Sequence, residues 1–199
     1  MRRTPLAQRD RILEAALATF ATLGTNASSI QAVADRAGMS KQALLHYFPT
    51  KANLHAGVYE LLALRFRQQL PGVASELVSR SHDRYRGLIG AVLERFDDNT
   101  DAARFLAFDL LERPDEVLAW LRSEAAPWLG LIKGVVEQSN DVKDGFDPEA
   151  HVAVLGAMML MQSALVPRSD KRWRQRMKKA TVRAMHLSSH LDPPARTRR

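Results

Sequence analysis

The side chains best suited to bind another molecule lie between Ser28 and Lys51, in the sequence SSIQAVADRAGMSKQALLHYFPTK. This stretch predicts two short helices that are joined by a tight turn and followed at once by the start of a third helix. Two helices of this length cannot bury a core of their own, so they need a supporting helix and leave one helix on the surface. Such an arrangement is typical of a helix-turn-helix that docks on DNA.

The spacing of residues inside this stretch predicts where each helix begins and ends. Ser28 and Gln31 stand three apart, the spacing of a capping box, so Ser28 is predicted to cap the first of the two helices. Gly38 is predicted to form the turn, because glycine adopts a left-handed backbone at the least cost. Ser40 is predicted to cap the second helix. The residues expected to pack inward are Ile30, Val33, Ala34, Ala37, Met39, Ala43, Leu44 and Phe48, and those expected to face outward are Lys41, Gln42, His46 and Tyr47.

Catalytic chemistry is not indicated by the sequence. It contains no glycine-rich phosphate loop, no nucleophile elbow and no HExxH motif, so the chain is not expected to be an enzyme. His186 and His190 stand four apart but have no evident third metal ligand. Neither a metal nor another cofactor is therefore expected.

Composition favours a globular protein, and the charge distribution fits either a protein that contacts a polyanion with one end or ordinary solvated helix faces. The chain has 199 residues, a net charge of +7 and no cysteine, which excludes disulfides and fits a reducing cytoplasm. Residues 1–55 hold seven basic and three acidic residues, whereas residues 97–150 hold thirteen acidic and five basic residues. The N-terminus lacks the apolar run of a signal peptide. The longest near-apolar run, residues 151–166, is shorter than the roughly 20 residues that span a bilayer, so no membrane partner is expected.

Hydrophobic residues recur at helical spacing along the whole chain, and strand signals are nearly absent. The chain is therefore predicted to be all-α, with an N-terminal three-helix helix-turn-helix domain and a larger helical domain. Pro71-Gly72 is predicted to end the fourth helix and Pro127 to break the seventh. About nine helices are expected, over residues 4–24, 28–37, 40–48, 51–70, 74–98, 101–112, 114–138, 148–166 and 170–191.

The N-terminal motifs are similar to those of the DNA-binding domain of the TetR family of bacterial repressors. The similarity covers about residues 8–60 and rests on positions that stand in register without a gap. These positions are Ser28, Val33-Ala34, Ala37-Gly38-Met39-Ser40, Leu44-Leu45-His46-Tyr47-Phe48, Thr50-Lys51 and Leu54. The resemblance implies a helix-turn-helix DNA-binding domain over residues 1–55 and a helical effector-binding and dimerisation domain over residues 56–199.

The resemblance also implies which residues contact a double-stranded DNA operator. Ser28 and Ser29 would hold phosphates at the start of their helix, where free N–H groups and the helix dipole favour an anion. Residues 40–43 would face the major groove, where lysine suits guanine, glutamine suits adenine and alanine suits the thymine methyl. Tyr47 and Lys51 would contact further phosphates. The expected DNA-binding residues are Ser28, Ser29, Gln31, Ser40, Lys41, Gln42, Ala43, His46, Tyr47 and Lys51.

Two positions depart from the family pattern. Gln42 stands where the family often has glycine or proline, so it is expected to add direct contact with a base. Leu45 stands where the family usually has a tyrosine, so one phosphate contact is missing. The second departure bears on the affinity for DNA.

Two C-terminal segments predict a homodimer. In the last helix, apolar residues recur at spacings of four and three, as in a seam that packs on another helix. Residues 151–166 are apolar nearly all round, so that helix must be buried on both sides. The resemblance implies that these two helices pair with those of a second subunit; the alternative is that the seam packs within one chain. The expected interface residues are Val152, Leu155, Gly156, Met159, Trp173, Met177, Ala180, Ala184 and Leu187.

The resemblance further implies a small-molecule pocket in the larger domain. Aromatic residues and methionines at helical spacing supply candidate lining, although the same pattern is typical of a plain core. The candidates are Tyr85, Phe96, Phe105, Phe108, Trp120, Trp128, Met158, Met161 and Gln162. Their chemistry favours an apolar or aromatic effector.

These observations together predict a dimeric, ligand-responsive transcriptional repressor of the cytoplasm. It would bind a palindromic operator and be released by a small-molecule effector. One alternative is an activator or co-repressed regulator with the same DNA-binding domain. The other is a ligand-binding or scaffold protein whose DNA-binding domain is vestigial.

Overall fold

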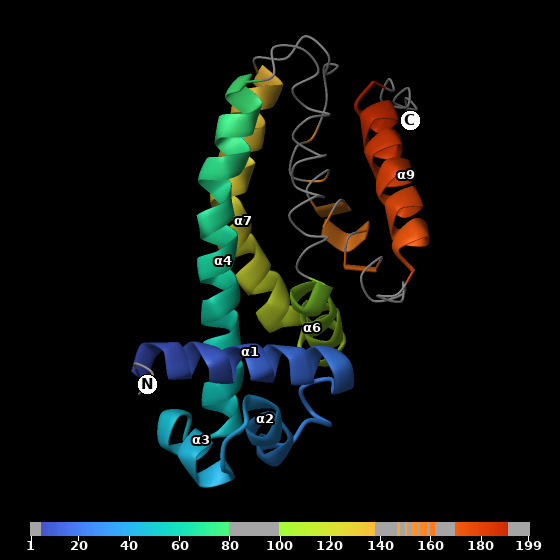
Figure 1. The fold of residues 1–199 in the computed structure, drawn as a ribbon. Coiled ribbons are helices and arrows are strands. Elements are labelled where there is room, and N and C mark those ends of the chain that lie inside the picture. The colour runs from blue at the N-terminus through green and yellow to red at the C-terminus, as the bar shows by residue number, and fades with distance from the viewer. Residues whose placement is uncertain are drawn as a thin grey trace, which may run out of the picture. The chain divides into compact units, whose positions relative to one another are not determined.

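The computed structural model of the chain is all-α, as the sequence predicted (Figure 1). It describes residues 5–79, 100–137 and 170–190, together with residues 147, 150, 153–154, 156–158 and 160–161. Within these ranges no strand occurs, and no helix is long and apolar enough to cross a membrane. The predicted helix over residues 148–166 and the loop before it lie largely outside the described residues.

The described helices agree with most of the predicted boundaries. Their bounds are α1 Pro5–Leu23, α2 Ile30–Ala37, α3 Lys41–Tyr47, α4 Lys51–Ser79, α6 Thr100–Glu112, α7 Pro114–Glu137 and α9 Lys171–His190. The chain divides into two compact units. Unit 1 comprises Met1–Gln68 and Asn99–Glu124, and unit 2 comprises Gln69–Asp98 and Ala125–Arg199. Unit 1 thus contains α6 and the first part of α7 together with the helix-turn-helix.

The core of unit 1 forms where α1 packs against α2 and α6. Figure 1 shows α1 lying across α4, with α2 and α3 on one side of it. Apolar residues at helical spacing on α1 face this core and are buried. The buried hydrophobic residues of this core are Ile12, Leu13, Ala16, Leu17, Phe20, Val33, Ala34, Leu44, Leu54, Val58, Phe105 and Leu106.

A glycine lets α4 approach its neighbours closely. A Cβ on Gly57 would lie 2.8 Å from Leu13 Cδ2 and 2.9 Å from Phe48 Cε1, closer than van der Waals contact allows. Two ion pairs also join α1 to α4 at the surface. Arg9 of α1 contacts Glu60 of α4 at 3.0 Å, and Arg65 of α4 contacts Glu14 of α1. The supporting helix that the sequence required is therefore α1, fixed to α4 by both packing and charge.

The cap of α2 differs from the prediction. Ser29, not Ser28, is the N-cap, and its side chain accepts a hydrogen bond from the backbone N–H of Ala32. Ser28 is buried, and its hydroxyl donates to the Gly24 carbonyl oxygen at 2.7 Å. The amide of Gln31 donates to Asp35 instead of returning to the cap. Only Ser28 has the capping-box spacing to Gln31, but its hydroxyl is turned inward to the Gly24 carbonyl, and Ser29 is left to cap the helix.

Two prolines predicted to interrupt helices lie inside them. α4 continues through Pro71 to Ser79 and so includes the start of the predicted fifth helix, and α7 continues through Pro127 to Glu137. A proline inside a helix removes one hydrogen bond and crowds the preceding turn, which makes a boundary common but not obligatory. Val73, just beyond Pro71, has an exposed fraction of 0%. The burial of Val73 beyond Pro71 thus favours the continuation of α4 past the proline.

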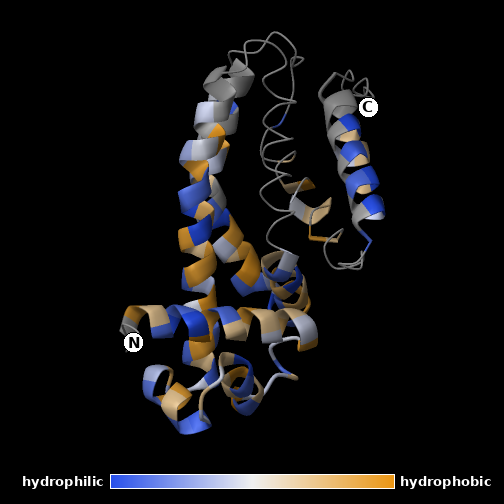
Figure 2. Cartoon of the chain, in the orientation of Figure 1, coloured by the Kyte–Doolittle hydropathy of each residue, from blue (hydrophilic) through white to orange (hydrophobic). Residues whose placement is uncertain are grey.

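The last helix of unit 2 begins where the sequence predicted. Asp170 accepts a hydrogen bond from the backbone N–H of Trp173 at 2.8 Å and so caps α9. Figure 2 shows strongly hydrophilic residues alternating with more hydrophobic ones along α9. Trp173 nevertheless has an exposed fraction of 43%, whereas Thr181 is buried. An exposed tryptophan beside the basic residues of α9 marks one face of the helix as distinct.

Candidate DNA-binding surface

The turn between α2 and α3 has the backbone that the sequence required. Gly38 adopts φ +62° and ψ +46°, the left-handed conformation that glycine tolerates best. The Gly38 and Met39 N–H groups donate to the carbonyl oxygens of Asp35 and Ala34 at 3.0 Å, which closes the end of α2. Ser40 then caps α3 by accepting from the Ala43 N–H at 3.2 Å. The turn and the second cap are confirmed.

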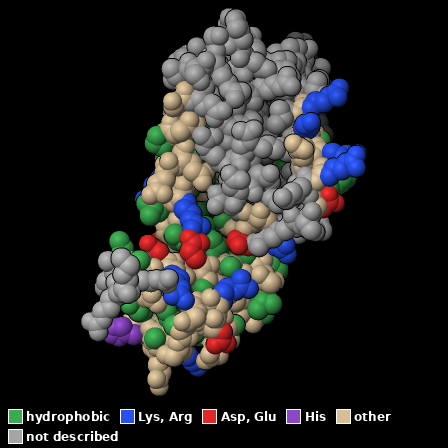
Figure 3. All heavy atoms as spheres, in the orientation of Figure 1, with side chains coloured by type: hydrophobic (Ala, Val, Ile, Leu, Met, Phe, Trp, Pro, Cys, Tyr) green, Lys and Arg blue, Asp and Glu red, His purple; other side chains and the backbone are tan. Residues whose placement is uncertain are grey.

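This turn presents the first residues of α3 to solvent. Ser40, Lys41, Gln42 and Ala43 are all exposed, and so is His46 one turn later. The inward packing predicted for Ala43 is therefore wrong: α3 has seven residues, and within the helix only Leu44 is fully buried. On the face drawn in Figure 3, basic and acidic side chains of unit 1 are interspersed. The candidate surface is thus a short polar helix end rather than a block of charge.

The remaining expected DNA-binding residues lie at differing depths. Ser29 and Gln31 are exposed at the start of α2, whereas Tyr47 and Lys51 are half-buried. The Lys51 ammonium donates to the backbone carbonyl of Asn26, in the α1–α2 loop, at 3.0 Å. The Ser28 hydroxyl is occupied inside the protein, so its structural place is in the loop rather than on the surface.

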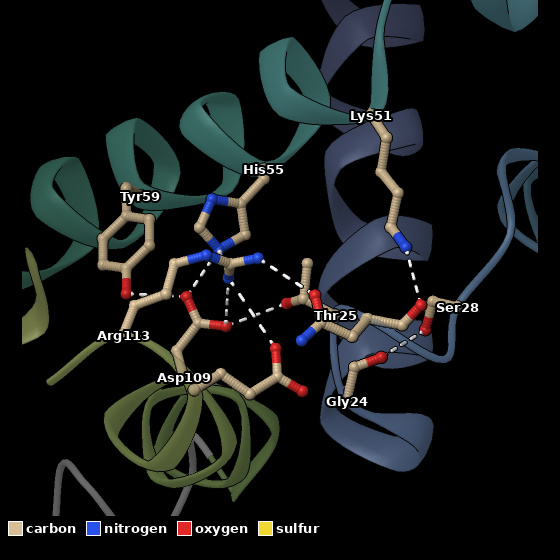
Figure 4. A network of polar contacts seen from close by, with 10 residues as sticks. Gly24, Thr25, Ser28, Lys51, His55, Tyr59, Asp109 and Arg113 are labelled. Atoms are coloured by element: carbon tan, nitrogen blue, oxygen red, sulfur yellow. Dashed lines mark hydrogen bonds and ion pairs between the residues drawn. The ribbon is translucent and has the colours of Figure 1, made fainter.

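A buried carboxylate lies directly behind this loop (Figure 4). Asp109, on α6, has an exposed fraction of 0%. Its Oδ2 accepts from His55 Nε2–H at 2.5 Å and from the Tyr59 hydroxyl at 2.9 Å, both on α4. Its Oδ1 accepts from the Thr25 hydroxyl at 2.9 Å and from Arg113 Nη1 at 3.2 Å. One carboxylate therefore joins α6 to α4, to the α1–α2 loop and to the corner between α6 and α7.

The network determines the ionisation of Asp109. Burial disfavours the charged carboxylate, but the hydrogen bond and charge of His55 and the hydrogen bonds from Thr25 and Tyr59 outweigh it, so the pKa of Asp109 lies below its usual value of 3.8. The pKa of Tyr59 is raised, first by burial and then by the charge of Asp109 and its hydrogen bond. Asp109 is thus ionised and Tyr59 is protonated at neutral pH.

We expect the contribution of Asp109 to stability to depend on pH. Its pKa is lower in the folded chain than in the unfolded chain, so its stabilisation is present above about pH 4 and is lost as the pH falls through the folded pKa. The groups that face it are His55 and Tyr59 from α4 and Arg113 from the α6–α7 corner. Urea unfolding of wild type and Asp109→Asn should show a stability difference that shrinks between pH 5 and pH 2. A difference that is constant over this range would contradict the assignment.

An aromatic cluster surrounds the network. Phe105, on α6, has ring centroids at 6.1 Å from Phe20, 5.6 Å from His55 and 5.3 Å from Tyr59. Tyr59 in turn lies 5.2 Å from Trp120 on α7. Phe105 is fully buried, so this candidate pocket residue lies in the core of unit 1. The cluster keeps water away from the Asp109 hydrogen bonds.

The structure places only some of the other candidate residues. Of the pocket candidates, Phe108, Trp120 and Met158 are half-buried, Trp128 is buried and Met161 is exposed, and Tyr85, Phe96 and Gln162 lie outside the described residues. Of the interface candidates, Trp173, Ala180 and Ala184 are exposed, and Gly156 and Met177 are half-buried. Val152, Leu155 and Met159 lie outside the described residues, and the side chain of Leu187 is not described. Pocket and interface both remain predictions.

The sequence reasoning missed the residues of the buried network. His55, Thr25 and Arg113 carry no motif, and their meeting depends on contacts more than fifty residues apart. Asp109 did carry a signal: it falls on the same helical stripe as Phe105 and Leu106, where an acidic residue is unusual. A charged residue on an otherwise apolar helix face predicts a buried partner.

Comparisons with known proteins agree with this geometry. Residues 12–58 match the bacterial regulatory proteins of the tetR family. The HTH-type transcriptional regulator RutR of Escherichia coli K12 is 42% identical over 52 residues, which are 26% of this chain and 24% of RutR. The match thus spans about a quarter of the length of this relative.

Solved structures share the fold over 92–100% of the chain. The fatty acid degradation regulator FadR of Bacillus halodurans has a TM-score of 0.69 at 14% identity, covering 100% of both chains. FadR of Bacillus subtilis, in complex with stearoyl-CoA, has a TM-score of 0.67 at 14% identity, covering 92% of this chain and 99% of that one. The ketosteroid regulator KstR2 of Mycobacterium tuberculosis has a TM-score of 0.68 at 16% identity, covering 92% and 95%. At such identities the likeness concerns the fold alone.

Proposed function

This chain belongs to the TetR family of bacterial regulatory proteins through residues 12–58, and on that premise we propose that it is a transcriptional repressor. It would bind a palindromic operator as a homodimer in the cytoplasm and be released by a small-molecule effector. We propose residues 1–55 as the DNA-binding domain and residues 56–199 as the effector-binding and dimerisation domain. No catalytic step is part of this proposal.

The observation that carries the proposal is the exposed start of α3. Lys41, Gln42 and Ala43 stand free in the first turn of a helix that is capped by Ser40 and anchored by one buried leucine. A surface helix presented by its N-terminal turn is what the major groove accepts. Gln42 would hydrogen-bond the N6 and N7 edge of adenine, and Lys41 the O6 and N7 edge of guanine.

Phosphate contacts would come from the flanking elements. Ser29 is exposed at the N-terminus of α2, where backbone N–H groups and the helix dipole favour an anion. Lys51 and Tyr47 would reach neighbouring phosphates. We do not assign a phosphate to the Ser28 hydroxyl, since it donates to Gly24 inside the loop.

The exposed face of α9 supports a homodimer. Trp173, Ala180 and Ala184 are exposed and lie at the spacings of the predicted seam. Leaving a tryptophan and small residues on the surface of a polar helix favours packing against a second copy. Two copies would supply the two DNA-binding domains that a palindromic operator requires, about one DNA turn apart.

The effector proposed is an apolar or aromatic small molecule. The candidate lining residues other than Gln162 are aromatic residues and methionines. The fold neighbour FadR of Bacillus subtilis is seen with stearoyl-CoA, which has a long acyl chain. Titrating such a molecule into the protein–operator complex would distinguish release, expected for a repressor, from strengthened binding, expected for a co-repressed regulator.

Selection of bound sequences from random DNA tests the proposal. We expect an enriched palindrome with two half-sites. Gln42→Ala should relax the base preference at one position of each half-site, at a cost of roughly 1–3 kcal/mol. Gln68→Ala, which changes an exposed glutamine of α4, is its control.

Lys51→Ala should weaken binding to all sequences equally and reduce the slope of log affinity against log salt by about one, while Lys51→Arg should preserve that slope.

Two outcomes would contradict these roles. If no sequence is enriched and binding stays weak at low salt, the DNA-binding domain is vestigial, as the missing tyrosine at Leu45 would then explain. If Gln42→Ala selects the same motif as the wild type, Gln42 does not contact a base.

A further inference from the structure

The network behind the α1–α2 loop connects α6 to the DNA-binding surface by a short series of hydrogen bonds. We call the five residues Thr25, His55, Tyr59, Asp109 and Arg113 the Asp109 joint. The Asp109 carboxylate holds α4 through two donors and the α1–α2 loop through one. Figure 4 shows these side chains converging on the carboxylate from α4, α6 and the loop.

The joint continues into residues that are proposed to contact DNA. Arg113 bonds Asp109 through Nη1 and the Asn26 side-chain oxygen through Nη2, at 3.2 Å each. The backbone carbonyl of Asn26 accepts from Lys51, the proposed phosphate contact at the start of α4. Three residues after Asn26, the loop ends at Ser29, the cap of α2. Lys51 is thus linked to Asp109 through Asn26 and Arg113, and Ser29 lies four residues after Thr25, which bonds Asp109 directly.

The arrangement is better suited to fixing geometry than to adding stability. A buried ion pair gains little net free energy over apolar residues of similar size, because both charges lose their hydration. It does restrict direction, since each oxygen of Asp109 accepts from two donors.

We propose that Asp109 is a positioning residue for DNA binding: from α6, outside the helix-turn-helix, it fixes the α1–α2 loop and the start of α4 so that Ser29 and Lys51 meet the phosphates together. This inference rests on the proposed function for its effect on DNA. Its effect on the loop does not depend on that function. Loss of the joint should loosen the loop and weaken phosphate contact while leaving base selection by α3 intact.

Thr25→Val tests the link between loop and α6 most cleanly. The substitution keeps the shape of a buried side chain and removes the hydroxyl that donates to Asp109. Thr19→Val is the matched control, because Thr19 is also buried but its hydroxyl donates to Ala15 of its own helix. Hydrogen exchange of the full-length protein should become faster at residues 24–30 in Thr25→Val and not in Thr19→Val. Asp109→Asn should change the same amides more strongly.

Operator binding supplies the second measurement. On the palindrome selected by the wild type, we expect Thr25→Val to bind roughly three- to tenfold more weakly with an unchanged base motif, and Thr19→Val to bind as the wild type does. Equal exchange and equal affinity in the two threonine variants would overturn the proposal, as would a changed motif in Thr25→Val. If Asp109→Asn fails to fold, the comparison of Thr25→Val with Thr19→Val still tests the positioning role of Asp109. A wild type that selects no DNA contradicts the proposed function instead, and the exchange data separate the two failures.

Discussion

Leu44→Ala should lower the free energy of unfolding by about 2–5 kcal/mol and abolish operator binding. The helix α3 has seven residues, fewer than the roughly 12–15 that an isolated helix needs in water. Leu44 has an exposed fraction of 0% and is the only fully buried residue within the helix. Its truncation removes the apolar contact that holds the proposed base-contacting residues in place.

The neighbouring leucine provides a matched control. Leu45→Ala deletes the same atoms from a half-buried side chain on the same helix, so we expect a loss of about 1 kcal/mol. Denaturant unfolding followed by circular dichroism gives both free energies, and fluorescence anisotropy with labelled operator gives both affinities. Equal losses in the two variants would show that α3 is not held by Leu44.

Phe105→Ala should destabilise unit 1 by about 3–5 kcal/mol. The ring of Phe105 is fully buried and lies within about 6 Å, centroid to centroid, of Phe20, His55 and Tyr59. Removing it leaves a cavity between α1, α4 and α6 and exposes the Asp109 hydrogen bonds to water. The loss would be a large fraction of the 5–15 kcal/mol that typically stabilises a folded domain.

Phe108, the other phenylalanine of α6, provides a matched control for this prediction. Phe108 is half-buried, and Phe108→Ala should therefore cost clearly less than Phe105→Ala. Thermal and urea unfolding of both variants measure the difference. If Phe108→Ala were the more damaging change, the core of unit 1 would lie on the other side of α6.

Local signals predicted the parts of the fold that depend on neighbouring residues. The left-handed Gly38 and the Ser40 cap each follow from a few adjacent positions, and each is confirmed. The outward orientation predicted for Lys41, Gln42 and His46 agrees with their exposure, whereas the inward packing predicted for Ala43 is wrong.

The features of the fold that the sequence did not predict depend on contacts between residues far apart in the chain. The choice between Ser28 and Ser29 as cap depends on a hydrogen bond across the α1–α2 loop. The continuation of α4 through Pro71 goes with the burial of Val73 beyond it. The Asp109 joint brings together residues 25, 55 and 109, whose separation along the chain hides their proximity. A helical pattern identifies which face is buried but not which element covers it.

The hydrogen bond between Lys51 and Asn26 also has an entropic consequence. A lysine side chain that is immobilised from free solution loses up to about 2 kcal/mol of rotamer freedom. In this protein the side chain is already directed by the Asn26 carbonyl in the absence of DNA, so much of that loss accompanies folding. An ammonium has three donors, and two remain for a phosphate. The contact that shapes the loop thus prepares an ordered cation for the DNA backbone and reduces the disorder that binding must remove.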